Sequence, residues 1–138
     1  MKQDMKTYLK ALVVGAALPA LLVPLVLYLF VGFGKEEVLT KPVLHVIPLI
    51  WGLWNVLFVA LLRHILIPRL SYWVAGGVLG LLVAIWGVFW LQLPSMLGLS
   101  GLFGFLPLVG VPVVYAVVWR WVVKPLNEAM VLNGGAPR

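Results

Sequence analysis

Four long apolar stretches constrain this chain more than any other feature of its sequence. They cover roughly residues 8–33, 43–62, 72–93 and 103–123 of 138. At a rise of about 1.5 Å per residue, each is long enough as a helix to cross a hydrocarbon core of about 30 Å. Only 10% of the residues are charged, whereas a soluble domain has about 25%. The sequence therefore predicts an all-α, polytopic integral membrane protein, a single membrane domain of four transmembrane helices.

The connections between these stretches are short, which favours an antiparallel up-down bundle. The first connection carries charges from Lys35 to Lys41, the second is basic, and the third, Pro94–Gly101, is uncharged. The third connection is compatible with either a short re-entrant piece or an amphipathic piece at the membrane interface. Residues 124–138 are predicted to form a cytoplasmic tail that is frayed at its end.

Lysine and arginine are distributed unequally between the two sides of this threading. One side has only Lys35 and Lys41, and the other has the remaining eight: Lys2, Lys6, Lys10, Arg63, Arg69, Arg120, Lys124 and Arg138. This asymmetry predicts that both termini are cytoplasmic, in a plasma membrane of the prokaryotic (inner-membrane) type. The first stretch is too long for the apolar region of a cleaved signal peptide, so we expect it to be retained.

The formal net charge of +6 then lies entirely on the cytoplasmic side. Basic residues near a membrane surface attract anionic lipid headgroups, by roughly 1 kcal/mol each. We therefore expect the basic residues to bind anionic lipid headgroups on the cytoplasmic side, and we expect no nucleic-acid partner.

The second span has a polar face and an aromatic face. At about 100° per residue, His45, Pro48, Gly52, Asn55 and Val59 share one arc, which we expect to point into the bundle. Trp51, Trp54 and Phe58 are expected on the opposite side, toward lipid or a partner. Asn55 lies near mid-span, where an unpaired amide is costly, so it is predicted to bond to a neighbouring helix. The alternative is a polar path lined by His45 and Asn55.

The third span carries a stripe of small residues suited to close helix packing. Its members are Gly76, Gly80, Val83, Ala84 and Gly87. Small residues four apart let two backbones approach closely in a membrane. The stripe predicts either a contact inside the chain or a seam between two copies.

Aromatic and basic residues near the ends of the spans predict anchors at the lipid interface. Trp73 and Trp90 are separated by about the thickness of the hydrocarbon core, and Trp119 and Trp121 neighbour Arg120 and Lys124. Prolines predict bends or local unwinding in two spans, at Pro19 and Pro24 in the first and at Pro107 and Pro112 in the fourth.

The sequence predicts no enzyme, cofactor or metal site. It contains no cysteine, and its two histidines bracket the second span, too far apart to share one metal ion. Glu36, Glu37 and His45 lack the spacing of a known metal motif. The leading hypothesis is an accessory or scaffold subunit that packs against other transmembrane helices in a larger membrane complex. The alternative is a small self-associating channel or uniporter without an embedded acidic residue.

Overall fold

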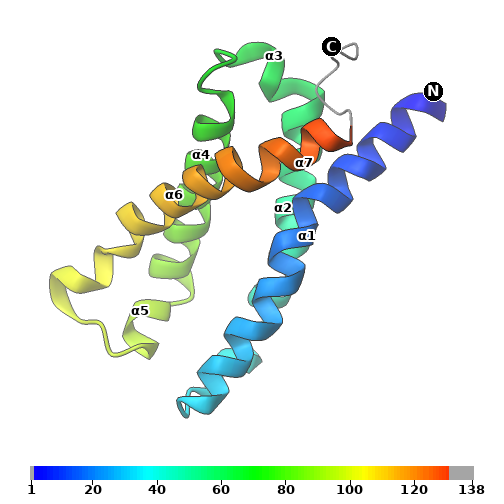
Figure 1. Cartoon of the computed structure of the whole chain (residues 1–138). Helices are drawn as coiled ribbons and strands as arrows, with labels where there is room; N and C mark the ends of the chain where they lie inside the picture. Colours follow the sequence, from blue (N-terminus) through cyan, green and yellow to red (C-terminus); the bar gives the residue numbers. More distant parts are fainter. Residues whose placement is uncertain (1, 131–138) are drawn as a thin grey trace. The chain divides into compact units, whose positions relative to one another are not determined.

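The computed structural model describes residues 2–130, and within this range the regular elements are helices joined by short connections, with no strand (Figure 1). Four helices are long and apolar enough to cross a membrane: Met5–Gly32, Leu44–Ile65, Ser71–Trp90 and Gly101–Ala129. The four predicted spans are confirmed at this level. The antiparallel order and the cytoplasmic termini stay predictions.

The chain divides into two compact units. Unit 1 contains residues 2–65 together with 123–130, and unit 2 contains residues 66–122. The elements of unit 1 are α1 (Lys2–Gly32), the 3-10 turn η1 (Glu36–Thr40), α2 (Pro42–Leu57), η2 (Phe58–Leu62), α3 (Arg63–Ile65) and α7 (Lys124–Ala129). Those of unit 2 are α4 (Ser71–Ile85), η3 (Trp86–Trp90), α5 (Leu93–Met96), the 3-10 turn η4 (Gly101–Phe105) and α6 (Pro107–Val118). The segment η5 (Trp119–Val123) continues α6 and carries the chain back into unit 1.

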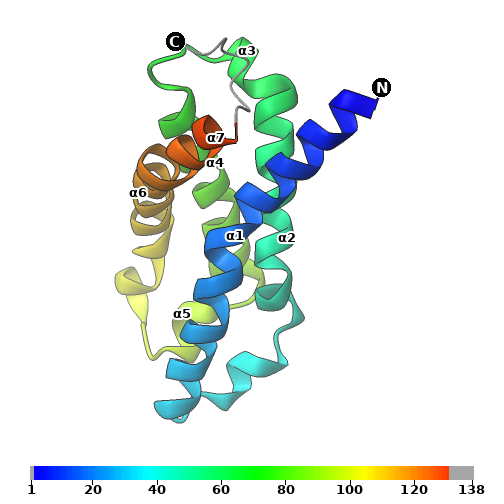
Figure 2. The same cartoon turned by 45° about the vertical axis from the view of Figure 1, so that its right-hand side comes forward.

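Each unit is built around one pair of packed helices. In unit 1, α1 lies along α2, as Figures 1 and 2 show, and α7 contacts α1. In unit 2, α4 packs against α6.

Prolines begin helices as often as they lie inside them, where the structure has Pro19, Pro24, Pro48 and Pro112. Pro42, Pro94, Pro107 and Pro125 each occupy the first turn of a helix. A proline is favourable there because the amide it lacks would have no partner within the helix. Pro107 therefore begins α6, where the sequence predicted a bend or unwinding.

The prolines inside the first span bend it without breaking it. Pro19 and Pro24 both lie within the continuous helix α1, which is bent in both views (Figures 1 and 2). Pro19 has no N–H to donate to the carbonyl of Gly15, one turn earlier.

Three segments are π-helical, a feature that the sequence analysis did not predict. They are η2, η3 and η5. In the turn that closes η3, the N–H of Leu91 donates to the carbonyl of Trp86 at 3.1 Å, a five-residue step. A π turn holds more residues than the 3.6 of an α turn, so faces predicted with a fixed α-helical period shift beyond it.

Two span boundaries differ from the prediction. The fourth helix continues through Ala129, so residues 124–129 of the predicted tail are helical, whereas residues 131–138 lie outside the described range. The third span ends at Trp90, because Gln92 adopts a left-handed conformation with φ of 51°. A left-handed residue does not continue a right-handed helix.

Candidate functional site

The most specific polar feature of unit 1 is a reciprocal pair of buried amides. Asn55 on α2 and Asn127 on α7 are both 0% exposed. Nδ2 of each donates to Oδ1 of the other at 2.9 Å. Nδ2 of Asn55 also donates to the carbonyl of Ala11 on α1 at 2.8 Å. Both N–H groups of Asn55 are thus used, and its side chain joins three helices.

Two glycines allow α1 and α2 to approach closely enough for these bonds. A Cβ atom on Gly15 would lie 2.6 Å from the carbonyl oxygen of Trp51 and 2.7 Å from Cβ of Asn55. A Cβ on Gly52 would lie 2.7 Å from the carbonyl oxygen of Leu12. Neither Gly15 nor Gly52 therefore has space for a larger side chain. The prediction of Gly52 as a packing residue agrees with this contact.

Asn127 and Gly15 were missed in the sequence reasoning. Asn127 was assigned to the tail, although Trp119, Val123 and Asn127 recur at the four-residue spacing of one helical face. Gly15 follows Ala11 by four residues, which is the small-residue pattern of close packing. Both signals were therefore present, and both were weaker than the glycine stripe of the third span.

The predicted inward position of His45 is wrong. His45 is exposed, and its Nε2 lies 3.2 Å from the carbonyl oxygen of Leu39 in the preceding turn. The helical face of the second span is buried only in its second half, at Gly52, Asn55 and Val59. His45 and Asn55 consequently do not line one continuous polar path within the chain.

The predicted exposed aromatic face of the second span is also wrong. Trp51 is 4% exposed and Phe58 is 0% exposed, while Trp54 is half-buried. At 100° per residue, Trp51 lies only about 40° from Asn55 around the helix. Both therefore fit within one wide buried stripe, and the aromatic residues do not form an opposite face.

The glycine stripe of the third span lies against α6 of the same chain. A Cβ on Gly76 would lie 2.5 Å from the carbonyl oxygen of Tyr115 and 2.6 Å from Cβ of Trp119. A Cβ on Gly80 would lie 2.7 Å from Cα of Pro112. Of the two predicted alternatives, the stripe therefore forms a contact inside the chain.

The outer part of the stripe is less tightly packed. Ala84 is 3% exposed, but Gly87 is half-buried and has room for a Cβ, which would lie 3.5 Å from Leu93. The close contact in unit 2 is therefore concentrated at Gly76 and Gly80.

Among the predicted lipid anchors, Trp119 is wrong, because it is 0% exposed and packs over Gly76. The remaining anchors are accessible: Trp73 is 36% exposed, Trp90 81% and Trp121 67%. The guanidinium carbon of Arg120 lies 5.6 Å from the centroid of the Trp121 ring, a distance suited to a cation–π contact. Lys124 Nζ lies 3.4 Å from Glu128 Oε1, one turn later. The position of these predicted anchors at a lipid interface stays a prediction.

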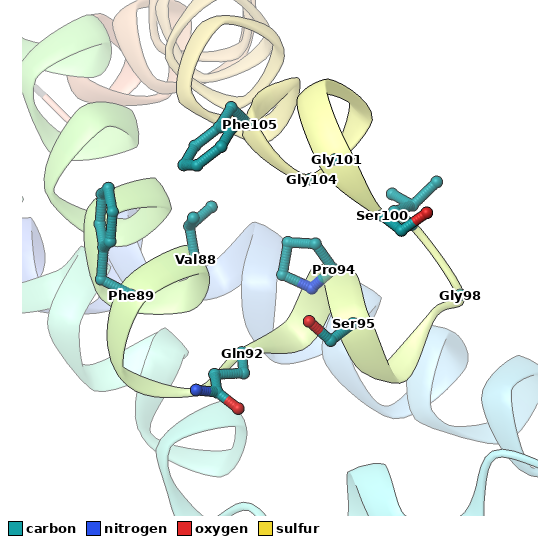
Figure 3. A pocket seen from close by; sticks show the side chains of 11 residues that line it. Val88, Phe89, Gln92, Pro94, Ser95, Gly98, Ser100, Gly101, Gly104 and Phe105 are labelled. Atoms are coloured by element: carbon teal, nitrogen blue, oxygen red, sulfur yellow. The ribbon is translucent and has the colours of Figure 1, made fainter.

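Among the side chains that the structure describes, those of residues 5–42 and 44–130, no three from His, Asp or Glu are grouped so as to hold a metal ion. A cavity does lie in unit 2, beside the connection between the third and fourth spans (Figure 3). No family model, no curated protein and no solved structure matches this chain. Its function is therefore argued from its own geometry.

Proposed function

We propose that this small membrane protein is a non-catalytic accessory or scaffold subunit that packs against transmembrane helices of a larger membrane complex. The observation that carries the proposal is the free side of the fourth helix. None of the residues in its most apolar 18-residue window is buried within the chain.

The two sides of α6 differ in what they contact. One side, with Pro112, Tyr115 and Trp119, packs against the glycines of α4. The other side contains six exposed residues at helical spacing, which we call the valine face: Leu106, Val109, Gly110, Val113, Val114 and Val117. The valine face is therefore the side of α6 that does not pack against α4.

The composition of the valine face suits a helical partner. A Cβ on Gly110 would meet no atom within 4 Å, so the glycine leaves a shallow depression in the exposed surface. Valine side chains are nearly fixed at χ1 in a helix, so little conformational entropy is lost when another helix covers them. Membrane helices associate through such small and stiff residues, because lipid supplies no hydrophobic driving force between them.

The test is purification of the full-length protein in mild detergent, followed by mass measurement of the native assembly. We expect a hetero-complex that persists in the Gly32→Leu variant and is lost in Gly110→Leu. Both glycines have open space around them, so both variants can fold. Equal complex formation by both variants would contradict the role of the valine face.

The channel alternative makes a different prediction in the same preparation. It requires a homogeneous homo-oligomer that passes ions or a small solute in liposomes and loses that flux in Asn55→Leu. The hydrogen bonds of Asn55 to Ala11 and Asn127 favour a packing role for this amide over a pore-lining role. Flux that depends on Asn55 would therefore overturn the accessory proposal.

The cytoplasmic location of both termini is proposed from the lysine and arginine asymmetry. The sequence has no cysteine, so single cysteines at Gln3 and Leu39 give a clean background. In intact cells, a membrane-impermeant thiol reagent should label the cysteine at position 39 and not the one at position 3. The reverse pattern would overturn the orientation.

A further inference from the structure

The cavity in unit 2 has the size of a small-molecule site. Its volume is about 560 Å³, within the range of about 300–1,000 Å³ typical of ligand pockets. It lies where the chain turns from η3 through α5 into η4.

The walls of the cavity divide into an apolar end and a polar end. Phe89 and Phe105 form the apolar end together with Val88, and the two phenyl centroids are 6.2 Å apart. The Gln92 amide and the Ser95 hydroxyl lie on the side away from Phe105 (Figure 3). Such a division suits an amphiphilic molecule, with its hydrocarbon against the phenyl rings and its polar group at the amide and hydroxyl.

The cavity is surrounded by uncharged sequence. From Leu70 to Trp119 the chain contains no charged residue and no histidine. A charged head group would therefore find no counter-ion in the walls, whereas a hydroxyl group finds donors and acceptors in Gln92 and Ser95. The lining thus favours an uncharged polar group on the ligand.

The shape of the cavity is held by its own backbone. Gln92, Gly98 and Gly101 all have positive φ, at 51°, 78° and 59°. The amide of Leu99 donates to the carbonyl of Pro94 at 2.8 Å, and Pro94 is buried. A non-glycine residue in the left-handed region is uncommon and occurs often where a loop is held for a ligand. The walls of the cavity are therefore defined by the backbone conformation of this connection.

The residues beside the cavity lead us to expect its opening near a membrane surface. Trp90, Leu102 and Phe103 are 81%, 87% and 65% exposed and lie at the adjoining ends of the third and fourth spans. Aromatic residues at span ends occupy the boundary between headgroups and hydrocarbon. Neutral lipids such as acylglycerols are amphiphiles that reach this boundary with an uncharged polar end.

We infer that this cavity binds an uncharged, hydroxyl-bearing lipid with a hydrocarbon chain, of the mono- or diacylglycerol class. The phenyl end holds the chain, and Gln92 and Ser95 bond to the glycerol hydroxyl groups. This inference concerns unit 2 and does not depend on the valine face of α6.

The test uses the full-length protein in nanodiscs containing a monoacylglycerol with a photoactivatable diazirine in its acyl chain. After irradiation, peptide mass spectrometry should locate adducts mainly within residues 88–105. Unlabelled monoacylglycerol should compete, and a lysophospholipid with the same chain and a charged head group should not. Adducts spread evenly over the exposed faces of α1 and α6, or equal competition by the charged lipid, would overturn the inference.

Two variants sharpen this test. Gly104 lines the cavity and has room for a Cβ, so Gly104→Leu should fill the cavity and lower labelling about tenfold, the equivalent of one decade in affinity. Gly32→Leu makes the same change in open space on α1 and should label like the unmodified chain. Ser95→Ala removes the hydroxyl assigned to the glycerol contact without adding bulk and should weaken competition by monoacylglycerol several-fold. Unchanged labelling in both cavity variants would exclude this site.

Discussion

The helix pair of unit 1 and the helix pair of unit 2 both depend on glycine, but they use it differently. In unit 1, Gly15 and Gly52 bring two backbones together around the Asn55 amide, which then bonds to Ala11 and Asn127. In unit 2, Gly76 and Gly80 receive the bulk of α6 at Tyr115 and Trp119. The first contact surrounds a reciprocal pair of side-chain amide bonds, whereas the second receives the bulk of an aromatic side chain.

This difference teaches what each contact can specify. Dispersion between close helices is favourable, and a separation of about 0.5–1 Å already removes a quarter to a half of it. A reciprocal amide pair has one productive register, because both bonds are lost if either helix moves by a residue. The amide pair should therefore fix the register of unit 1, and both units should be sensitive to added volume at their close glycines.

The largest expected effect is in unit 2. Gly76→Leu places a branched side chain where even a Cβ would be 2.5 Å from the carbonyl oxygen of Tyr115. We expect the free energy of unfolding to fall by about 3 kcal/mol or more, which is the upper end of the range for overpacked cores. Thermal unfolding in detergent measures the loss, and hydrogen exchange should show it first in α4 and α6.

A matched control for that variant is its neighbour. Gly77 has room for a Cβ, which would lie 3.9 Å from Ala116, so Gly77→Ala should change stability by less than about 0.5 kcal/mol. If Gly76→Leu were as stable as Gly77→Ala, the close contact between α4 and α6 would be wrong.

The second effect is steric and falls in unit 1. Gly15→Ala introduces a Cβ 2.7 Å from that of Asn55, so α1 and α2 must separate. We expect a loss of about 1–3 kcal/mol. Hydrogen exchange should increase in α1 and α2 while α4 and α6 keep their protection. Loss of protection confined to α4 and α6 would contradict the assignment of this contact to unit 1.

The third effect tests the bonds rather than the volume. Asn55→Leu leaves the amide of Asn127 without its reciprocal partner and should cost about 0.6–2 kcal/mol, as for hydrogen bonds between membrane helices. Asn127→Leu should cost a similar amount. The double variant should lose less than the sum of the two, because each single variant already removes both reciprocal bonds. Strict additivity would show that the two amides do not interact.

The smallest effect is expected at the end of the fourth helix. Glu128→Gln removes the ion pair between Lys124 and Glu128, whose side chains are 31% and 51% exposed. Exposed pairs one helical turn apart contribute about 0.3–0.5 kcal/mol. The change in melting temperature should therefore lie near the limit of measurement. A large change would contradict the small contribution expected of this exposed ion pair.

The sequence predicted the four spans well because hydropathy and length are properties of each helix by itself. It predicted helical faces less well, as His45, Trp51 and Trp119 show. Which part of a face is buried depends on where the neighbouring helix crosses, and that is a property of two helices together. The errors at Trp51 and Phe58 also reflect the width of the buried stripe on α2, which is broader than the arc assigned to it.

The candidate sites were predictable to different degrees. Asn55 was identified because an amide in mid-span needs a partner, but the partner, Asn127, lies in a segment whose sequence looked like a tail. The cavity in unit 2 depends on backbone conformation at Gln92, Gly98 and Gly101, which hydropathy does not encode. Its position beside an uncharged connection was the only sequence-level sign.

The amide pair also imposes an order on biogenesis. Asn55 is synthesised 72 residues before Asn127, so the ribosome must deliver two further spans before the reciprocal bonds can form. During that interval the carbonyl of Ala11, already present on the first helix, is the partner within reach of Asn55. The bond to Ala11 can therefore form within the first two helices, whereas the reciprocal bonds require the helical turn that contains Asn127.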